Sequence, residues 1–497
     1  MKKILFYMVI FVVSTVLLLS SCGGDIVVHE DDGIYTLDED VVSDGGLYFD
    51  SSDYISPDIL SSSVSDVSGQ AGSGQQSDGG SAAGSGSAGS TSKPSSNGAS
   101  GGGSSAGGST GGAGSGGSNG TGGSNIGKPG SYTPVYYNSP MRAIWISQWN
   151  LQSVFEKSNT AAQFSSQIAA IMKTVKDYGY NTVVVQLRPN GDSFYNSAYY
   201  PWSKFCTGTA GRAPAYDPTE IMVNEAHKQG LSFHAWFNPL RLDSNANMAA
   251  TDNKYLTKQW YNNKRGDYVV YVGSYWYLNP AYPEVRQLII NGAVEIMQKY
   301  KVDALHIDDY FYPTTATSFD STAYSKLGGG KSLAEWRRGN INTLVRGIYS
   351  AIKNSNNKIR FGISPAGNIN NNYYDLYADV ALWGSSSGFM DYCMPQIYFG
   401  YEHNTLDYIK CLNDWKRTVT NSGIDLVIGL GAYKIGLESD GGSDEWSRDT
   451  TILKRQVQDA RSGLGGRYKG FCMFDYDSFF SSASLNTAQR NNLKPVI

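Results

Sequence analysis

Cysteine is scarce in this chain of 497 residues, and so is net charge. The 40 basic and 44 acidic residues leave a formal net charge of −4. Because nucleic-acid-binding domains usually carry a basic surface, we expect no nucleic-acid partner. Of the five cysteines, the four after Cys22 form no C-x-x-C pair and have no histidine at metal-ligand spacing. We therefore expect small buried thiols, no metal and no cofactor, with a disulfide left open if the compartment is oxidising.

The apolar run near the start of the chain is too short for a membrane-spanning helix, which needs ~20 residues. It follows Lys2 and Lys3, extends from Ile4 to Leu19, and ends in small residues before Cys22. This is the build of a cleaved export signal. It also resembles the lipobox of bacterial lipoproteins, in which the cysteine is lipidated and becomes the mature N-terminus. We expect residues 1–22 to direct export and Cys22 to anchor the protein to a membrane of the cell envelope, on the exported side; a transmembrane anchor is the alternative.

Residues 23–139 lack the apolar side chains that a core requires. Residues 23–60 are acidic and poorly periodic, and residues 61–139 consist largely of Ser, Gly, Ala and Asn. Such compositions predict a disordered acidic segment followed by a flexible tether. From Pro140 to Ile497 the composition becomes that of a folded domain.

Short apolar segments alternate with helical patterns throughout residues 140–497. The predicted strands cover 142–147, 182–188, 232–238, 304–310, 360–365, 392–399, 426–433 and 470–476. The predicted helices between them cover 161–178, 218–229, 283–300, 332–354, 407–421 and 450–461. Eight such repeats predict an α/β fold, a single (β/α)₈ TIM-type barrel. A doubly wound sheet is the alternative, but no Gly-rich phosphate turn follows the first strand.

Polar side chains gather at the carboxyl ends of the predicted strands, where barrels of this class carry their active sites. In each strand the paired polar residues are two or four apart, with apolar residues between them, so they share a face. The pairs are Gln186 with Arg188, His234 with Asn238, His306 with Asp308, and Gln396 with Tyr398. Any one of these could be a satisfied core group, but four strands polar toward the same end favour a functional site.

Asp308 and Asp309 are the strongest catalytic candidates at this end of the barrel. Adjacent strand residues point to opposite faces, so their phase with His306 favours Asp308 as the inward carboxylate. Glycoside hydrolysis needs two carboxyl groups, and we assign Asp308 as nucleophile or transition-state stabiliser. The general acid stays open among Asp309, Glu402 and Asp475. A metal site built from these acids and histidines is the alternative, although their spacing matches no compact ligand motif.

Aromatic and cationic residues near the same strand ends are candidates for substrate binding. The chain contains 35 tyrosines and ten tryptophans, and amphipathic rings can stack on sugar faces, although core packing explains most of them. Ser332 and Glu335 form a capping-box pattern, which places two arginines in the first turns of a helix, where cations oppose the helix dipole. Those arginines bind either an acidic substituent of the substrate or a loop carboxylate. The candidates are Trp145, Trp236, Asn279, Tyr310, Asn368, Trp383, Arg337 and Arg338.

An ordered series of motifs over residues 140–480 is similar to the glycosyl hydrolase-like family 10. They start at positions 141 (MRAIWIS), 186 (QLR), 236 (WFNP), 278 (LNP), 306 (HIDDYFYP), 336 (WRRGN) and 394 (MPQIY). The resemblance implies a (β/α)₈ barrel with glycosidase activity, and the family includes envelope lipoproteins that cut peptidoglycan glycan strands, preferentially where stem peptides have been removed. More distantly, residues 303–308 resemble the fourth strand of α-amylase-like barrels, whose last Asp is the nucleophile. The match departs at His306, where those enzymes carry Arg, and in the fifth strand, which has no carboxylate.

These observations predict an exported hydrolase of an amino-sugar glycan, with peptidoglycan glycan strands as its substrate. Substrate assistance by an N-acetyl group would remove the need for a protein nucleophile. Two other functions stay open. One is hydrolysis of another envelope, capsular or dietary polysaccharide. The other is glycan binding without turnover on a degenerate barrel.

Overall fold

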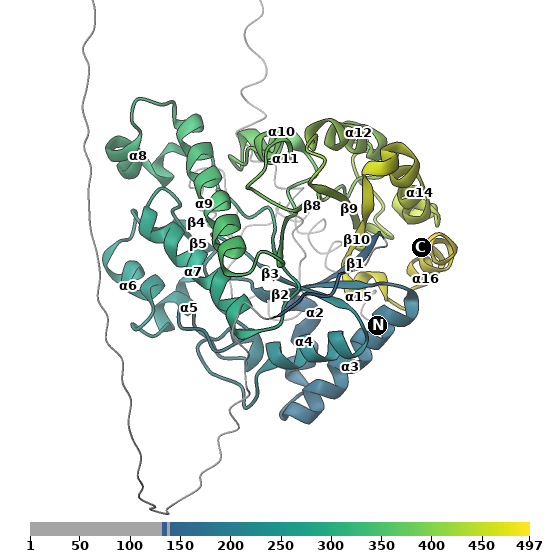
Figure 1. Cartoon of the computed structure of the whole chain (residues 1–497), viewed down its shortest axis with the longest axis horizontal. Helices are drawn as coiled ribbons and strands as arrows, with labels where there is room; N and C mark the ends of the chain where they lie inside the picture. The colour runs from purple at the N-terminus through teal and green to yellow at the C-terminus, as the bar shows by residue number, and fades with distance from the viewer. Residues whose placement is uncertain (1–131, 137–139) are drawn as a thin grey trace, which may run out of the picture. The chain divides into compact units, whose positions relative to one another are not determined.

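Eight parallel strands close into a barrel in the computed structural model, which describes residues 132–136 and 140–497 (Figure 1). Successive strands of the barrel are neighbours, and the last pairs with the first. The strands are β1 (Met141–Ile146), β2 (Thr182–Arg188), β3 (Ser232–Phe237), β6 (Ala304–Ile307), β7 (Arg360–Ile363), β8 (Tyr392–Cys393), β9 (Asp425–Gly431) and β10 (Tyr468–Phe474). The predicted (β/α)₈ barrel is confirmed, and all eight carboxyl ends open at one end of it.

Two barrel strands are shorter than the sequence predicts. β6 ends at Ile307 because Asp308 Oδ1 accepts from the backbone N–H of Tyr310 (3.3 Å), and Phe311 N donates to Asp309 O (2.7 Å). These local bonds turn the chain away from the ladder. β8 covers Tyr392–Cys393, since Pro395 has no N–H to continue the pairing, and two isolated bridges at Gln396, to Ala366 and Gly429, follow.

Helices surround the barrel (Figure 1). The six predicted helices correspond to α3 (Ala161–Tyr178), α4 (Pro218–Lys228), α7 (Pro283–Lys299), α9 (Leu333–Ser355), α12 (Tyr408–Thr418) and α14 (Ile452–Leu464). Their apolar faces pack on the outer side of the strands; in α9 the fully buried apolar residues are Ile341, Leu344, Val345, Ile348 and Ile352. Ser332 caps α9 in the predicted capping box with Glu335. Among the described residues, no helix combines the length and apolar character needed to cross a membrane.

Shorter elements lie in the loops. The α-helices are α2 (Gln148–Glu156), α5 (Asn245–Ala250), α6 (Leu256–Asn263), α8 (Ser321–Leu327), α10 (Ile369–Tyr374), α11 (Val380–Ser385), α13 (Glu445–Arg448), α15 (Tyr476–Phe479) and α16 (Ser484–Leu493). The 3₁₀ helices are η4 (Lys204–Cys206), η5 (Thr317–Phe319), η6 (Ala432–Lys434), η7 (Gly465–Arg467) and η8 (Lys494–Val496). A hairpin that the sequence analysis did not predict, β4 (Val269–Val272) with β5 (Tyr275–Leu278), is inserted between β3 and β6 and contacts α5 and α6.

Side chains fill the barrel interior. Tyr392 crosses it, and its hydroxyl lies 2.9 Å from His234 Nδ1 and 3.1 Å from His306 Nδ1. The facing position on β7 is Gly362, where an added Cβ would lie 1.9 Å from the Tyr392 ring. Glycine is therefore required there for steric reasons, because a larger residue would displace the ring that joins the two histidines.

Residues 132–136 lie against the opposite end of the barrel, next to the start of β6. The Asp303 carboxylate accepts hydrogen bonds from Tyr132 Oη and Val135 N, each at 2.6 Å, and from Phe233 N (2.6 Å). Tyr136 Oη accepts from Arg360 N (3.0 Å) and donates to Lys358 O (2.7 Å). The folded domain thus includes contacts from residues that the sequence analysis places in the tether.

The four described cysteines, at positions 206, 393, 411 and 472, are buried and unbridged, which confirms the prediction of buried thiols. Cys22, the export signal at 1–22 and the acidic segment at 23–60 lie outside the described residues, and so does most of the predicted tether.

Candidate active site

Asp308 and Asp309 lie directly after β6, at the carboxyl end of the barrel. Both side chains are about 3% exposed. Trp236, from the neighbouring strand β3, donates its indole N–H to Asp308 Oδ2 (3.0 Å), and Tyr310 N donates to Asp308 Oδ1 (3.3 Å). Because the strand ends at Ile307, strict alternation of faces does not apply to the two acids. Asp309 is also buried, and its charge acts on Asp308.

Burial raises the pKa of Asp308 well above its usual range, and the neighbouring Asp309 charge raises it further. Arg241 and the donors Tyr310 N and Trp236 Nε1 lower the pKa of Asp308 without cancelling that rise. Two carboxyl groups so placed cannot both ionise cheaply, so the pair holds a proton at a pH where an exposed Asp has lost it. A carboxyl group that keeps its proton can act as a general acid.

Arg241 is the main site residue that the sequence analysis missed. It follows β3 by four residues, lies with its guanidinium carbon 4.1 Å from the centre of the Tyr310 ring, and acts electrostatically on Asp308. Its Nε and Nη2 both donate to Pro189 O at 3.3 Å. An arginine just beyond a strand end was a signal in the sequence, but it lies outside the two-residue alternation that selected the other candidates.

Gln186 and Asn238 meet at the same end of the barrel. Gln186 Nε2 donates to Asn238 Oδ1 (2.8 Å), and Gln186 Oε1 accepts from Gln148 N (2.9 Å), just after β1. The Asn238 Nδ2 donor is buried with no hydrogen-bond partner among the described residues. The structure therefore brings these two predicted residues together and leaves an amide donor for a ligand.

A cluster of aromatic side chains packs inside the barrel, where Trp145 and Tyr398 are buried. Trp145 meets Tyr398 and Phe474 edge to face, with ring centres 6.3 and 5.9 Å apart. Tyr433, which the sequence analysis did not select, lies 5.7 Å from Tyr398. Trp145 also lies 6.0 Å from His306, so the predicted residues Trp145, Tyr398 and His306 belong to one cluster.

The two predicted histidines lie deeper in the barrel than the carboxyl pair. Burial lowers the pKa of His306 to about 3 and lowers that of His234 well below its usual range, so both are neutral. His306 Nε2 lies 3.1 Å from Ser364 Oγ. His234 pairs in register with Ala304, the first residue of β6, and lines a cavity of about 300 Å³ near the amino ends of the strands. His234 is therefore far from the strand ends where the sequence analysis placed it.

Gln396 and Asn368 lie nearer the mouth. Gln396 Nε2 donates to Ser364 O (3.0 Å), which joins β8 to the end of β7. Asn368 caps α10, with its side-chain oxygen accepting from Asn370 N (3.0 Å), and is partly exposed. Both positions are compatible with a ligand at the strand ends.

Several other candidates pack within the fold. Arg188 follows a register shift in β2 and lies over Tyr200 and Phe237, in the outer core, so it does not share the inward face of Gln186 as expected. Trp383 is fully buried beside Phe311. Asn279 is fully buried and donates to Asp267 O (2.9 Å). In this conformation none of the three predicted residues reaches the mouth.

Arg337 forms a buried ion pair. Its Nη2 lies 2.6 Å from Asp320 Oδ1, and both side chains are 0% exposed. This is the loop-carboxylate alternative of the sequence analysis. Arg338 instead stacks on Tyr373, 4.0 Å from the ring centre, and donates to its carbonyl oxygen.

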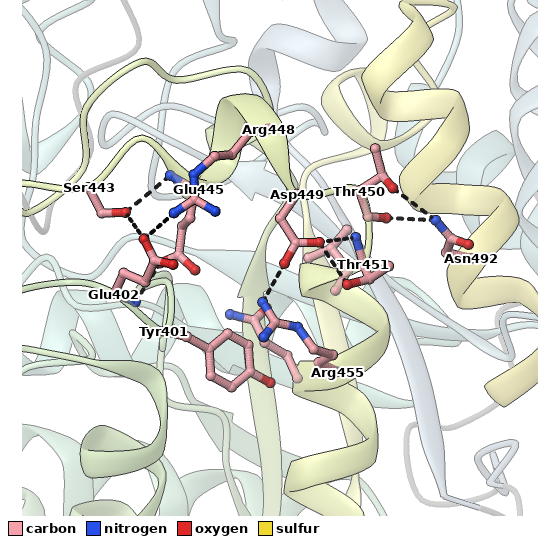
Figure 2. Close-up of polar contacts among 12 residues, drawn as sticks. Tyr401, Glu402, Ser443, Glu445, Arg448, Asp449, Thr450, Thr451, Arg455 and Asn492 are labelled. Atoms are coloured by element: carbon pink, nitrogen blue, oxygen red, sulfur yellow. Dashed lines mark hydrogen bonds and ion pairs between the residues drawn. The ribbon is translucent and has the colours of Figure 1, made fainter.

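Glu402 lies at the surface in the loop after β8 (Figure 2). Its Oε2 accepts from Ser443 Oγ (2.7 Å) and pairs with Arg448. The bond from Arg448 lowers the pKa of Glu402, which favours the ionised form and makes this residue a poor proton donor.

Asp475 is fully buried at the end of β10, where it joins α15 to α2. Its Oδ1 caps α15 by accepting from Ser478 N (3.1 Å), and its Oδ2 accepts from Asn150 Nδ2 (2.8 Å). Among the four predicted acids, only Asp308 and Asp309 therefore form a carboxyl pair. Within residues 132–136 and 140–497, no cluster of three or more His, Cys, Asp or Glu side chains is arranged to hold a metal ion.

A family model described as glycosyl hydrolase-like 10 matches residues 140–447. Glycosyl hydrolase YngK of Bacillus subtilis (strain 168) is 36% identical over 342 residues, which are 64% of this chain and 66% of that protein. Glycosyl hydrolase DigH of Escherichia coli (strain K12) is 33% identical over 329 residues, 60% of this chain and 74% of the relative. The chain thus spans just under two thirds of YngK.

Solved structures are similar at a lower level. The glycoside hydrolase domain of PgaB (BpsB) from Bordetella bronchiseptica has a TM-score of 0.47 and 13% identity, covering 71% of this chain and 99% of that domain. The endo-1,4-beta-mannanase from Rhizomucor miehei has a TM-score of 0.44 and 9% identity, covering 74% and 98%.

Proposed function

This chain belongs to the glycosyl hydrolase-like 10 family, and from that premise we propose that it is an exported glycoside hydrolase of an amino-sugar glycan. The observation that carries the proposal is the buried pair of Asp308 and Asp309 at the carboxyl end of the barrel. Hydrolysis of a glycosidic bond requires one carboxyl group that gives a proton and one that is ionised. This pair supplies both forms within two residues.

Asp308 is the proton donor. Its raised pKa keeps the proton available, and its fixed bonds to Trp236 and Tyr310 hold the carboxyl group in one orientation. The bond from the anomeric carbon to the leaving oxygen breaks as Asp308 protonates that oxygen. Water adds to the anomeric carbon and loses its proton to a carboxylate. The electrostatics thus favour the acid role for Asp308 over the nucleophile role that its sequence position first suggested.

Asp309 supplies the negative charge. An ionised Asp309 stabilises the positive charge that develops on the sugar ring, either directly or through the N-acetyl group of an amino sugar. The Gln186–Asn238 pair, with its unpartnered amide donor, can hold a hydroxyl or acetamido oxygen close to the acids. The rings of Trp145 and Tyr398 provide an apolar surface for a sugar face.

Peptidoglycan glycan is the polymer we propose. The support is the series of sequence motifs from position 141 to position 398, together with the predicted export signal and the predicted lipidation of Cys22. We further propose that the protein is a lipoprotein of the cell envelope, anchored to a membrane through Cys22, with the tether before residue 132 allowing the barrel to reach its substrate. Replacing Cys22 by Ala should release the protein from the membrane fraction, while Cys411→Ala should leave it there.

Digestion of purified glycan strands, followed by mass spectrometry, tests the activity. We expect the full chain to cut peptidoglycan glycan freed of stem peptides, and Asp308→Asn to abolish cutting. Asp252→Asn is the matched control, because its side chain is 62% exposed. Binding without cleavage by the wild type would instead favour a glycan-binding protein, and cleavage of only another polysaccharide would reassign the substrate.

A further inference from the structure

A strip of side chains, made of Tyr310, Arg241 and Tyr275, extends from the carboxyl pair to the inserted hairpin. Arg241 lies between two rings, 4.1 Å from the centre of Tyr310 and 5.8 Å from that of Tyr275 on β5. Because Tyr310 is two residues from Asp308, the strip begins next to the reacting atoms.

The strip presents one ring to solvent at the catalytic end of the barrel. Tyr275 is 37% exposed, although it is a large aromatic residue. An exposed tyrosine near polar side chains is suited to stacking on a sugar face. The ring of Tyr310 is partly buried beneath Arg241.

The backbone holds this strip in place. Leu242 N donates to Trp276 O (2.8 Å), Leu278 N donates to Leu240 O (2.8 Å), and Arg241 forms a bridge with Tyr277. The segment that carries Arg241 is therefore an added strand of the hairpin. A site built on paired strands is better ordered than one on a free loop.

Arg241 has the geometry of an anion-binding residue. A guanidinium carries five N–H donors, of which Nε and Nη2 contribute to the bonds with Pro189 O. Its stacking on Tyr310 fixes the plane of the group, and a fixed guanidinium plane suits bidentate binding of a carboxylate. The positive charge of Arg241 also lowers the pKa of Asp308 and so disfavours its protonated form. The charge of Arg241 therefore does not support Asp308 as a proton donor.

We propose that Arg241 and Tyr275 form a subsite that selects a sugar bearing a carboxylate, next to the bond that is cleaved. Arg241 binds the carboxylate and Tyr275 supports the ring of that sugar. This inference rests on the proposed function, and it specifies which amino-sugar glycans the site accepts. Binding of the carboxylate neutralises Arg241 and leaves Asp308 more strongly protonated in the complex than in the free enzyme.

A matched pair of substrates tests the subsite. The first is a glycan oligosaccharide of alternating N-acetylglucosamine and N-acetylmuramic acid with free lactyl carboxylates, and the second is the same oligosaccharide with those carboxylates amidated. We expect the wild-type full chain to prefer the carboxylate form by about 10- to 100-fold in kcat/KM, the size expected for a hydrogen-bonded charged group. The alkaline limit of kcat should lie at higher pH for the carboxylate form.

Variants of Arg241 and Tyr275 show which side chain causes the preference for the carboxylate form. Arg241→Gln should remove it, mainly through KM, while Arg241→Lys should retain part of it. Tyr275→Ala should lower kcat/KM by the same factor for both substrates. Arg265→Gln is the matched control, because Arg265 lies on the same insertion, exposed, over the Tyr261 ring at 4.0 Å. It should leave both rates unchanged.

Equal rates of the wild type on the two substrates would overturn the subsite and leave the hydrolase intact. Equal losses on both substrates in Arg241→Gln would also overturn it, since Arg241 would then act only through the carboxyl pair. If the wild type cuts neither substrate, the proposed function fails. Affinities of Asp308→Asn for the two oligosaccharides then decide the subsite, and equal affinities would refute it.

Discussion

The buried ion pair of Arg337 and Asp320 should be a large contributor to stability. Besides Asp320 Oδ1 at 2.6 Å, Arg337 donates to the carbonyl oxygens of Thr315 (3.1 Å) and Ala316 (2.7 Å), and to the hydroxyl of Tyr377 (3.0 Å). It therefore fixes much of the loop that follows the catalytic pair. Replacing Arg337 by Met leaves the Asp320 carboxylate buried without its counter-charge.

Breaking a buried pair in this way costs about 3–5 kcal/mol. We expect Arg337→Met to lower the free energy of unfolding by that amount, measured by equilibrium urea denaturation of the full chain. Arg346→Met is the matched control on the same helix, since Arg346 is exposed and its guanidinium lies over Phe389. Its free energy should change by less than about 0.5 kcal/mol.

The double variant Arg337→Met with Asp320→Leu should recover much of the loss, because the uncompensated charge is then gone. A loss below about 1 kcal/mol in Arg337→Met would refute this reasoning. A stable Arg337→Met protein with a raised KM would return Arg337 to the substrate-binding role.

Three further outcomes follow from the carboxyl pair and from Asp303. Trp236→Phe removes a donor that favours ionised Asp308, so the alkaline limit of kcat/KM should move up by about one pH unit; a downward move would contradict this. The raised pKa of Asp308 gives stability at low pH that is lost as pH rises through that pKa. Asp308→Asn should therefore raise the melting temperature more at pH 8 than at pH 5, and an equal effect at both would argue against the raised pKa. Asp303→Asn weakens the acceptor for Tyr132 and Val135, so the Val135 amide should exchange with solvent at least tenfold faster; unchanged protection would show that the contact contributes little.

The barrel could be predicted from the sequence because each strand–helix repeat carries its own signals. Apolar strands and amphipathic helices of normal length leave few alternatives once eight repeats are present. The ends of β6 and β8 were less predictable. They depend on side-chain bonds at Asp308 and on the missing N–H of Pro395, which compete locally with strand pairing.

Predictions of site residues failed where side chains no longer alternate between the inner and outer faces of a strand. Arg188 follows a register shift after Gln186, which turns it into the outer core. Trp383 looked like a stacking residue by type alone, but α11 buries it against the barrel. Arg241 acquires its role from a hairpin whose pairing is not local in sequence.

The carboxyl pair is tested most directly by the pH dependence of kcat/KM on glycan strands, measured for the wild type, Asp308→Asn and Asp309→Asn. The wild type should lose activity as pH rises through the raised pKa of Asp308. Asp308→Asn should lose about 10²- to 10⁴-fold at every pH. Asp309→Asn removes the like charge, so its remaining activity should fall off at lower pH than that of the wild type. Undiminished cleavage by Asp308→Asn, or an alkaline limit unmoved in Asp309→Asn, would contradict the account.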